Sequence, residues 1–332
     1  MLFNYFLGID ISKLTLDVAL LSKKKDLDMQ IKITNDKAGF KELNTWLRQQ
    51  KVPYGELLVC AEHTGTYGYD IQIWLESKKI SYAFVPALEI QRSIGLKRGK
   101  NDLVDAKRIA EYAYLRRETI TLSKRPSEDI LKLKTLLGER KMYVRNRAGM
   151  MARKDAMSKY ESAESRRRRE QAIKKFQDYI DSLEAQMEDI VKSNEEIFKN
   201  YTLIRTVVGI GLVNALNTIV YTNNFTSFQN ARQYACYIGV APFEHKSGTS
   251  VRGRTQVSSL SNHQLKSELT MAARNAVFTD PGLRAYYQRK MSEKGNAPGS
   301  YGIVLNAVKF KLILRMFSVV KSGTPYKVLS YY

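Results

Sequence analysis

The sequence predicts a chain in three parts: an α/β domain over residues 1–125, a helical region over 126–200 and a mainly α-helical domain over 201–332. In the first part, short apolar or alternating runs typical of strands are separated by helical periodicity. From Gly149 to Gly209 there is neither glycine nor proline, which favours long helices. After Tyr201, helical patterns follow one another with short turns between them.

The first part has the pattern of an open sheet with crossover helices. Strands are expected over residues 6–10, 14–21, 29–34, 57–62 and 81–85, and helices over 36–50, 66–79 and 102–117. Three meandering strands followed by β-α-β crossovers predict a mixed five-stranded sheet with helices on its faces. This is the ribonuclease-H-like arrangement, although periodicity alone does not choose it over other α/β folds.

The central part carries an apolar repeat with spacings of three and four. The repeat fits an a/d heptad seam with Asn194 at an a position, and its apolar members are Ile173, Phe176, Ile180, Leu183, Met187, Ile190 and Ile197. It predicts a coiled coil that joins two chains; the alternative is an amphipathic helix packed on its own protein. The arginine run 166–169 precedes the seam and is either a solvated face or a phosphate clamp.

The third part contains two polar or glycine-rich turns of interest. Residues 207–211 join two helical patterns, as in helix-hairpin-helix elements whose backbone N–H groups contact phosphate, although Gly-x-Gly is common. Residues 246–254 are rich in glycine, serine and basic residues. A helix over 262–276 follows, with its apolar residues on one side.

The charge of the chain predicts a polyanionic partner. The 54 basic and 33 acidic residues give a net charge of +21, and cations that neutralise phosphates release counterions. This favours nucleic acid over a membrane surface. No apolar run approaches the ~18 residues of a membrane span, no signal peptide is recognisable, and two cysteines do not make a disulfide framework. We therefore expect a cytoplasmic, nucleoid-associated protein without membrane contact.

Four acidic residues form the strongest candidate for a catalytic site. Asp10 and Glu62 end two strands that the fold places side by side, and Asp102 and Asp105 lie one turn apart on a helix. Such oxygen ligands favour Mg²⁺ or Mn²⁺, and two ions ~4 Å apart suit displacement at phosphorus. Each acid alone is more often a turn or cap residue, so the prediction depends on their joint occurrence. Asp17 and Glu111 are expected to be solvated instead.

Basic residues near these acids are the candidate nucleic-acid contacts. Cations beside carboxylates hold a phosphate that the acids would otherwise repel, and the candidates are Lys97, Arg98, Lys100, Lys107, Arg252 and Arg254. Other catalytic motifs are weak or missing from the sequence. Cys60 and His63 form a lone C-x-x-H without further zinc-ligand spacing, and there is neither a Walker A sequence nor a G-x-S-x-G elbow.

Residues 8–13, 62–67 and 100–106 resemble the DEDD transposases of the insertion sequence 110 family, relatives of the Piv and MooV DNA invertases. The third part is similar to that family's C-terminal transposase domain at residues 207–211, at 239–242 and at Ser247 with its following glycine. One departure is Val208, where the family often has proline. The resemblance spans nearly the whole chain.

The resemblance implies that Asp10, Glu62, Asp102 and Asp105 bind divalent metal in a RuvC-like, Holliday-junction-resolvase-like domain. It also implies that Ser247 is a nucleophile that forms a covalent phosphoserine link. Without the resemblance, a Ser-Gly pair near other serines is interpreted as a loop turn. A structured guide RNA from the element would pair with double-stranded donor and target DNA. A homodimer is expected, with a tetramer on DNA as a further possibility.

Several alternatives stay open at this point. One is a RuvC-like endonuclease that uses the four acids and water, and another is a Piv-like site-specific DNA invertase. A sugar-kinase-like or actin-like ATPase shares the opening hairpin, but residues 11–13 lack the glycines that cradle phosphate. A non-enzymatic nucleic-acid-binding protein with a coiled coil is the last.

Overall fold

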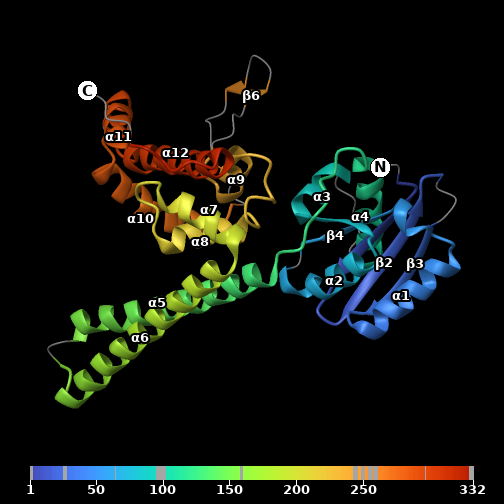
Figure 1. Ribbon diagram of the computed structural model, residues 1–332, viewed down its shortest axis with the longest axis horizontal. Helices are drawn as coiled ribbons and strands as arrows, with labels where there is room; N and C mark the ends of the chain where they lie inside the picture. Colours follow the sequence, from blue (N-terminus) through green and yellow to red (C-terminus); the bar gives the residue numbers. More distant parts are fainter. Residues whose placement is uncertain are drawn as a thin grey trace. The chain divides into compact units, whose positions relative to one another are not determined.

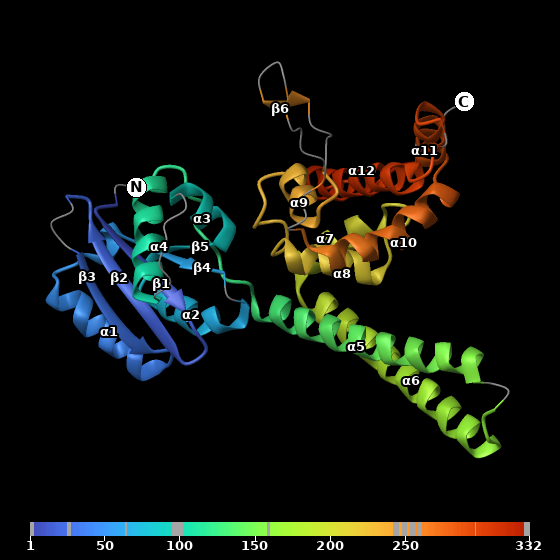
Figure 2. The same cartoon turned by 180° about the vertical axis from the view of Figure 1, so that it is seen from behind.

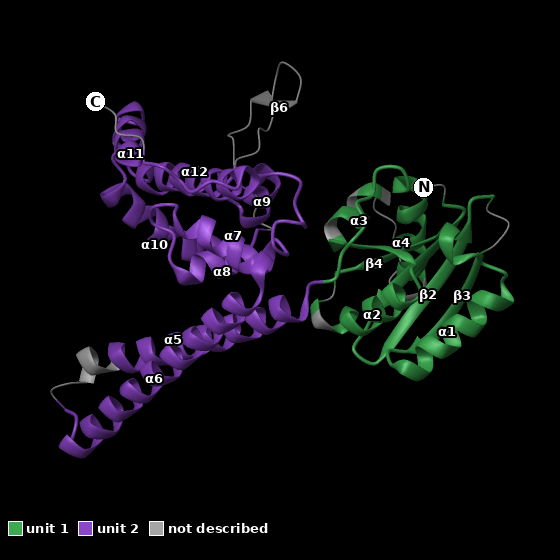
Figure 3. Ribbon diagram, viewed as in Figure 1, with its two compact units in different colours: residues 1–125 green, residues 126–332 purple. Residues whose placement is uncertain are grey.

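The protein consists of two compact units, residues 1–125 and residues 126–332 (Figure 3). The computed structural model describes residues 3–24, 28–63, 65–94, 102–157, 160–241, 246–247, 251–252, 257, 261–295 and 297–328. Within these ranges, no helix is both long enough and apolar enough to cross a membrane.

Unit 1 is built on a mixed five-stranded sheet, as the sequence predicts (Figure 1). The strands are β1 (Tyr5–Ile11), β2 (Thr15–Ser22), β3 (Asp28–Thr34), β4 (Leu57–Glu62) and β5 (Ser81–Val85). They lie in the order β3-β2-β1-β4-β5. The first three form an antiparallel meander, and β4 and β5 continue parallel to β1. The short turn between β1 and β2 enforces their antiparallel pairing.

The helices of unit 1 connect and cover this sheet. They are α1 (Lys37–Gln49), the 3₁₀ turns η1 (Tyr54–Glu56) and η2 (Gly65–Gly68), α2 (Tyr69–Ser77), α3 (Ala87–Ile94) and α4 (Asp102–Arg116). Asp36 caps α1 by accepting hydrogen bonds from the N–H groups of Ala38 and Gly39, both at 2.9 Å. Helix α3 was not predicted, and the helix expected from Thr66 starts as a 3₁₀ turn before it becomes α-helical.

The two faces of the sheet bury different residues because side chains alternate along a strand. Leu7, Ile9 and Val59 face α1 and α2. Phe6 and Cys60 face the opposite way, toward α4. Figure 2 shows α4 lying against the sheet. Each face therefore has its own apolar core.

Helix α4 packs directly on β1 because residue 8 is glycine. A Cβ atom on Gly8 would lie 2.0 Å from the carbonyl oxygen of Ala106 and 2.4 Å from the backbone nitrogen of Ala110. Two residues earlier, Phe6 packs edge-on against Tyr114, with 5.3 Å between ring centroids. Residues later in β1 thus meet residues earlier in α4. The helix runs antiparallel to β1, and its N-terminal end lies at the carboxyl end of that strand.

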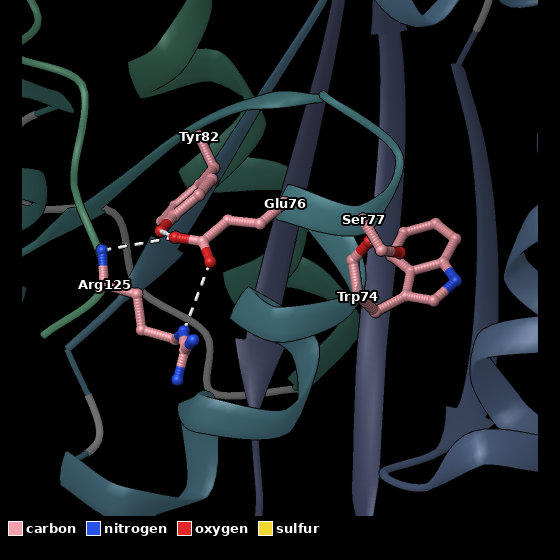
Figure 4. Close-up of polar contacts among 5 residues, drawn as sticks. All are labelled: Trp74, Glu76, Ser77, Tyr82 and Arg125. Carbon is pink, nitrogen blue, oxygen red and sulfur yellow. Dashed lines mark hydrogen bonds and ion pairs between the residues drawn. The ribbon is translucent and has the colours of Figure 1, made fainter. Parts of the chain in front are cut away.

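The last residues of unit 1 lie along the outer edge of β5, and Arg125 among them contacts Glu76 of α2 (Figure 4). The backbone N–H of Ser123 donates to the carbonyl oxygen of Tyr82 at 2.8 Å, and its side-chain Oγ accepts the N–H of Phe84 at 2.8 Å. Glu76 accepts from the hydroxyl of Tyr82 at 2.8 Å and from Nε of Arg125 at 3.2 Å. These contacts satisfy backbone groups that an open edge would leave unpaired.

Unit 2 is almost entirely helical. It begins with the long helices α5 (Glu128–Met157) and α6 (Ala163–Ser193) and continues with α7 (Glu195–Arg205), α8 (Leu212–Tyr221), α9 (Ala231–Ile238), the short strands β6 (Lys246–Ser247) and β7 (Val251–Arg252), α10 (His263–Thr279), α11 (Pro281–Glu293) and α12 (Ser300–Ser322). A single apolar core joins the first turns of α5 to the end of α6 and to α7–α12.

The apolar seam of α6 packs at least partly on its own chain. Leu183 and Met187 are buried in one cluster with Ile130 and Leu133 of α5. Asn194 does not occupy a seam position of a continuous helix, because α6 ends at Ser193. Its Oδ1 accepts the N–H of Ile197 at 3.1 Å, so it caps α7. A short polar side chain that bonds to the backbone nearby favours a cap over a helix interior. Pairing of two chains through this region stays a prediction.

Two residues in candidate phosphate-binding segments, Arg169 and Gly209, have structural roles. Arg169, the last residue of the arginine run, is buried and ion-paired with Glu161, so it is neither a solvated residue nor available to a phosphate. Gly209, in the turn between α7 and α8, has φ of +91°. A Cβ there would lie 2.6 Å from the carbonyl oxygen of Ala272 in α10. This glycine therefore serves the packing of the turn, and a phosphate contact stays a prediction.

Candidate active site

The strand register brings Asp10 and Glu62 to neighbouring positions. Ile9 of β1 pairs with Ala61 of β4, and one further step along both strands places Asp10 level with Glu62. Ile9 and Ala61 lie in the core on the α1–α2 side, so the next residues face the α4 side. Both carboxylates are half-buried. The central pair of strands thus ends in two acids on one face.

Helix α4 brings its first turns to the same end of the sheet. Asp105 directly precedes Ala106, whose backbone lies against Gly8. Burial raises the pKa of Glu62, and the negative charge of Asp105 raises it further. The packing of Ala106 on Gly8 places Asp105 at the end of the sheet where Glu62 lies. Asp102 is the first residue of the helix, and its side chain lies outside the described part of the structure.

The described acidic side chains do not by themselves form a complete set of metal ligands. The described side chains do not include that of Asp102. Among them, no three His, Cys, Asp or Glu residues lie close enough together to hold a metal ion. Asp105 is instead paired with Arg108 at 2.8 Å between Oδ1 and Nη1. The structure places Asp10, Glu62 and Asp105 at the same end of the sheet, with the two strand acids on the face that α4 covers. The four-acid site stays a prediction.

Lys107 already has an acidic partner. Its ammonium group is ion-paired with Asp28 at the start of β3, and both side chains are partly exposed. Such a pair contributes little to stability and is easily exchanged for a phosphate. A role of Lys107 in nucleic-acid binding stays a prediction.

Asp17 is the acidic residue that sequence reasoning placed wrongly. It was expected to be solvated, but it is 2% exposed. In the strand register, Asp17 lies opposite Asp10 of β1 and opposite Lys32 of β3. Nζ of Lys32 forms an ion pair with Oδ2 of Asp17 at 3.1 Å. Lys32, Asp17, Asp10 and Glu62 therefore form one row across four strands. The signal was available: Leu16 and Val18 face one core, and a sheet covered on both faces also buries the residue between them.

The predicted nucleophile lies in a small antiparallel pair of strands. Lys246 pairs with Arg252 and Ser247 pairs with Val251. The backbone of Ser247 and Arg252 is placed, but their side chains lie outside the described part of the structure. The same holds for the whole of four predicted contacts, Lys97, Arg98, Lys100 and Arg254.

Acids gathered at the carboxyl ends of central strands, in a chain of net charge +21, are typical of enzymes that act on nucleic-acid phosphates. Comparison with known families makes this specific. Residues 7–157 match the DEDD transposase family of the IS110 type, and residues 201–288 match the transposase family IS116/IS110/IS902. The chain belongs to the IS110 family of transposases and is therefore a DNA-binding transposase or site-specific recombinase.

Similar proteins match over different lengths. The pilin gene-inverting proteins of Moraxella bovis and Moraxella lacunata are each 26% identical over 324 residues, which is 97% of this chain and 97% of each relative. An uncharacterized 43.6 kDa protein of insertion element IS110 from Streptomyces coelicolor is 29% identical over 125 residues, or 38% of this chain and 30% of that protein. The match to the inverting proteins covers both units.

Proposed function

We propose that this protein is the transposase of an insertion sequence and that it cuts and rejoins DNA through a covalent phosphoserine intermediate. The observation that carries the proposal is the level placement of Asp10 and Glu62 on the face covered by α4, with Asp105 in the first turns of that helix. The strand order β3-β2-β1-β4-β5, with acids ending its central strands, supports the assignment of unit 1 as a RuvC-like domain.

The side chains that end β1 and β4 and begin α4 suit a divalent cation. Asp10, Glu62, Asp102 and Asp105 offer oxygen atoms alone, which Mg²⁺ and Mn²⁺ prefer. The raised pKa of Glu62 reflects burial and a neighbouring negative charge, both of which a bound cation would offset. Two such ions would supply electrostatic stabilisation of the attacking and leaving oxygens. The fit supports a metal-dependent reaction.

Ser247 is the proposed nucleophile. Its hydroxyl oxygen would form a bond to phosphorus while the bond from phosphorus to a deoxyribose oxygen breaks. The hydroxyl proton leaves as the freed deoxyribose oxygen gains one. Because the new phosphodiester conserves the bond energy, the reverse attack by a second DNA end rejoins the strands. The position of Ser247, next to a glycine in a polar segment, matches the family pattern.

The proposed partners are supported by the charge of the chain and by exposed apolar side chains on unit 2. A net charge of +21 suits both double-stranded DNA and a structured guide RNA, since both present phosphates. We propose that the α5–α6 hairpin contributes to a homodimer, with a tetramer on DNA. Exposed apolar side chains on these helices support a protein contact; they are Met142, Met151 and Tyr179.

The test is covalent capture of DNA. The protein is incubated with DNA from the element's end, its RNA and Mg²⁺, digested, and searched for a peptide containing Ser247 with DNA attached. We expect the adduct in the wild type and in a Ser250→Ala control, and none in Ser247→Ala. A Ser247→Ala protein that still cleaves strands would instead identify a RuvC-like endonuclease that uses water.

A site-specific invertase is the second candidate. The full-length similarity to two pilin gene-inverting proteins favours it. A plasmid with two inverted copies of the recognised site separates the two activities. Inversion of the intervening segment supports an invertase, whereas insertion into a target without a second copy supports a transposase.

A further inference from the structure

A lysine is buried in unit 2, and none of the described acidic residues pairs with it. Lys309, in the middle of α12, is 7% exposed. Within the described part of the chain, no carboxylate pairs with its ammonium group. Lysine is almost never buried unless paired, because an uncompensated charge is expensive to remove from water. Lys309 therefore calls for an anion that the described part of the chain does not provide.

The groups around Lys309 are positive as well. Burial, followed by the nearby charges of Lys266 and Arg274 on α10, lowers the pKa of Lys309 to about 8. Burial also lowers the pKa of Lys266. The acid on this helix, Glu268, is occupied by hydrogen bonds from Asn217 and Gln264. Three cations thus gather between α10 and α12 at a cost in stability.

Two polar groups on or next to the helices that carry these cations still have free hydrogen-bonding capacity. Asn306 lies one turn before Lys309 on the same face of α12. Its Nδ2 donates to the carbonyl oxygen of Val240 at 2.9 Å, while its buried Oδ1 has no hydrogen-bond partner among the described residues. The buried hydroxyl of Ser261 also lacks a partner within the described ranges, although such a group normally has one. These atoms suit a ligand that brings oxygen atoms and water.

The location of the three cations is as informative as their charge. Val240 ends the helix-capping turn after α9, and Ser261 precedes the cap of α10. In the sequence, the segment that carries Ser247 lies between these two residues. Asn306 contacts one root of this segment, and Lys266 lies one turn beyond Asn262 at the other.

We propose that Lys266, Arg274 and Lys309 form a binding site for a backbone phosphate of nucleic acid, at the root of the segment that carries Ser247. Lysine supplies a point charge to one phosphate oxygen, and arginine supplies a planar fork. The guanidinium of Arg274 is held in place by Tyr301, since its Nε donates to the hydroxyl at 2.7 Å and its centre lies 5.7 Å from the ring centroid. The phosphate chemistry is common to DNA and RNA. Its assignment to nucleic acid rests on the proposed function.

The test uses the full-length protein with Lys309→Met, which keeps the volume of the side chain and removes the charge. Binding to a DNA duplex and to an RNA hairpin is measured at several salt concentrations. We expect affinity for at least one of them to fall about tenfold, as for the loss of one charged hydrogen bond. The slope of log K against log salt should become shallower by about one phosphate contact. The Tm of the free protein should stay the same or rise, because a repelled buried charge is removed.

Lys321→Met is the matched control, since it removes the same charge from an exposed position of the same helix. It should leave the salt slope close to that of the wild type. Unchanged affinity and slope in Lys309→Met would overturn the proposal and make Lys309 a packing residue. If Lys309→Met does not fold, Lys266→Met and Lys309→Arg replace it: the first should weaken binding and the second should keep it.

These outcomes separate this site from the proposed mechanism. Ser247→Ala should abolish covalent capture and leave reversible binding intact, whereas Lys309→Met should weaken reversible binding. Equal weakening of DNA and RNA binding would show that the site accepts a backbone phosphate of either nucleic acid. Weakening of DNA binding alone or of RNA binding alone would show that the site is specific for that nucleic acid. A wild-type protein that binds neither would refute both the site and the proposed function.

Discussion

A methyl group at residue 8 is expected to lift α4 from the sheet. In Gly8→Ala the new carbon would lie 2.0 Å from the carbonyl oxygen of Ala106 and 2.4 Å from the nitrogen of Ala110. Carbon and oxygen atoms approach no closer than about 3.3 Å in favourable contacts, so the helix must retreat by roughly 1 Å. Both clashing atoms belong to the helix backbone, and no side-chain rotation relieves them. Overpacking of this kind costs about 1–3 kcal/mol.

The same displacement acts on the proposed catalytic site. Asp102 and Asp105 move with α4, whereas Asp10 and Glu62 stay on the sheet. A misplacement of about 1 Å costs roughly a hundredfold in rate when catalytic groups must converge. We therefore expect Gly8→Ala to lose DNA cleavage even below the temperature at which it unfolds.

Unfolding of unit 1 is measured by tryptophan fluorescence in urea. The chain has two tryptophans, Trp46 and Trp74, and both lie in this unit. Gly55→Ala is the control, because Gly55 is in the same unit and a Cβ there meets no atom within 4 Å. Its stability should change by less than about 1 kcal/mol. The reasoning is refuted if Gly8→Ala matches this control in both stability and cleavage.

Three further predictions concern single charges. Alanine at Asp10, Glu62, Asp102 or Asp105 should abolish recombination and leave the Tm in EDTA close to that of the wild type, because each substitution relieves repulsion; a large drop in Tm would contradict this. Lys32→Met should destabilise unit 1 by about 1 kcal/mol, since it leaves buried Asp17 unpaired. Adding Asp17→Asn should recover that loss in a double-mutant cycle, and additive losses would disprove the coupling. Asp280→Asn should cost about 3 kcal/mol, because Asp280 is 1% exposed and accepts from Arg315 at 2.7 Å. Burial alone would raise the pKa of Asp280, but hydrogen bonds from Leu283 and Arg315 lower it below 3.8. As the pH falls below about 4 and through the lowered pKa, Asp280 becomes protonated and the wild type should lose the stability that its charge contributes. Urea titrations at several pH values should show this loss of unfolding free energy in the wild type and not in Asp280→Asn.

Several errors in the sequence-based picture share one physical origin. The position of Asn194 depends on competition between a helix interior and a cap, which a heptad pattern does not weigh. Asp17 is buried because α4 covers the second face of the sheet, and that helix lies more than 80 positions further along the chain. The arginine run reads as solvated until Glu161 pairs with Arg169. Each error concerns a contact whose partner is distant or belongs to another element.

The sequence by itself determined the chemistry and the local elements of this protein. Alternation and apolar runs predicted the five strands, because a strand exposes or buries every second residue whatever lies beside it. Acid identity and net charge pointed to a phosphate-directed enzyme, and short motifs pointed to its family. Tertiary structure decided the depth at which α4 sits on Gly8, the row of charges from Lys32 to Glu62 and the gathering of cations around Lys309. These arise from packing between distant segments, since burial and charge proximity depend on neighbours that a local pattern does not contain.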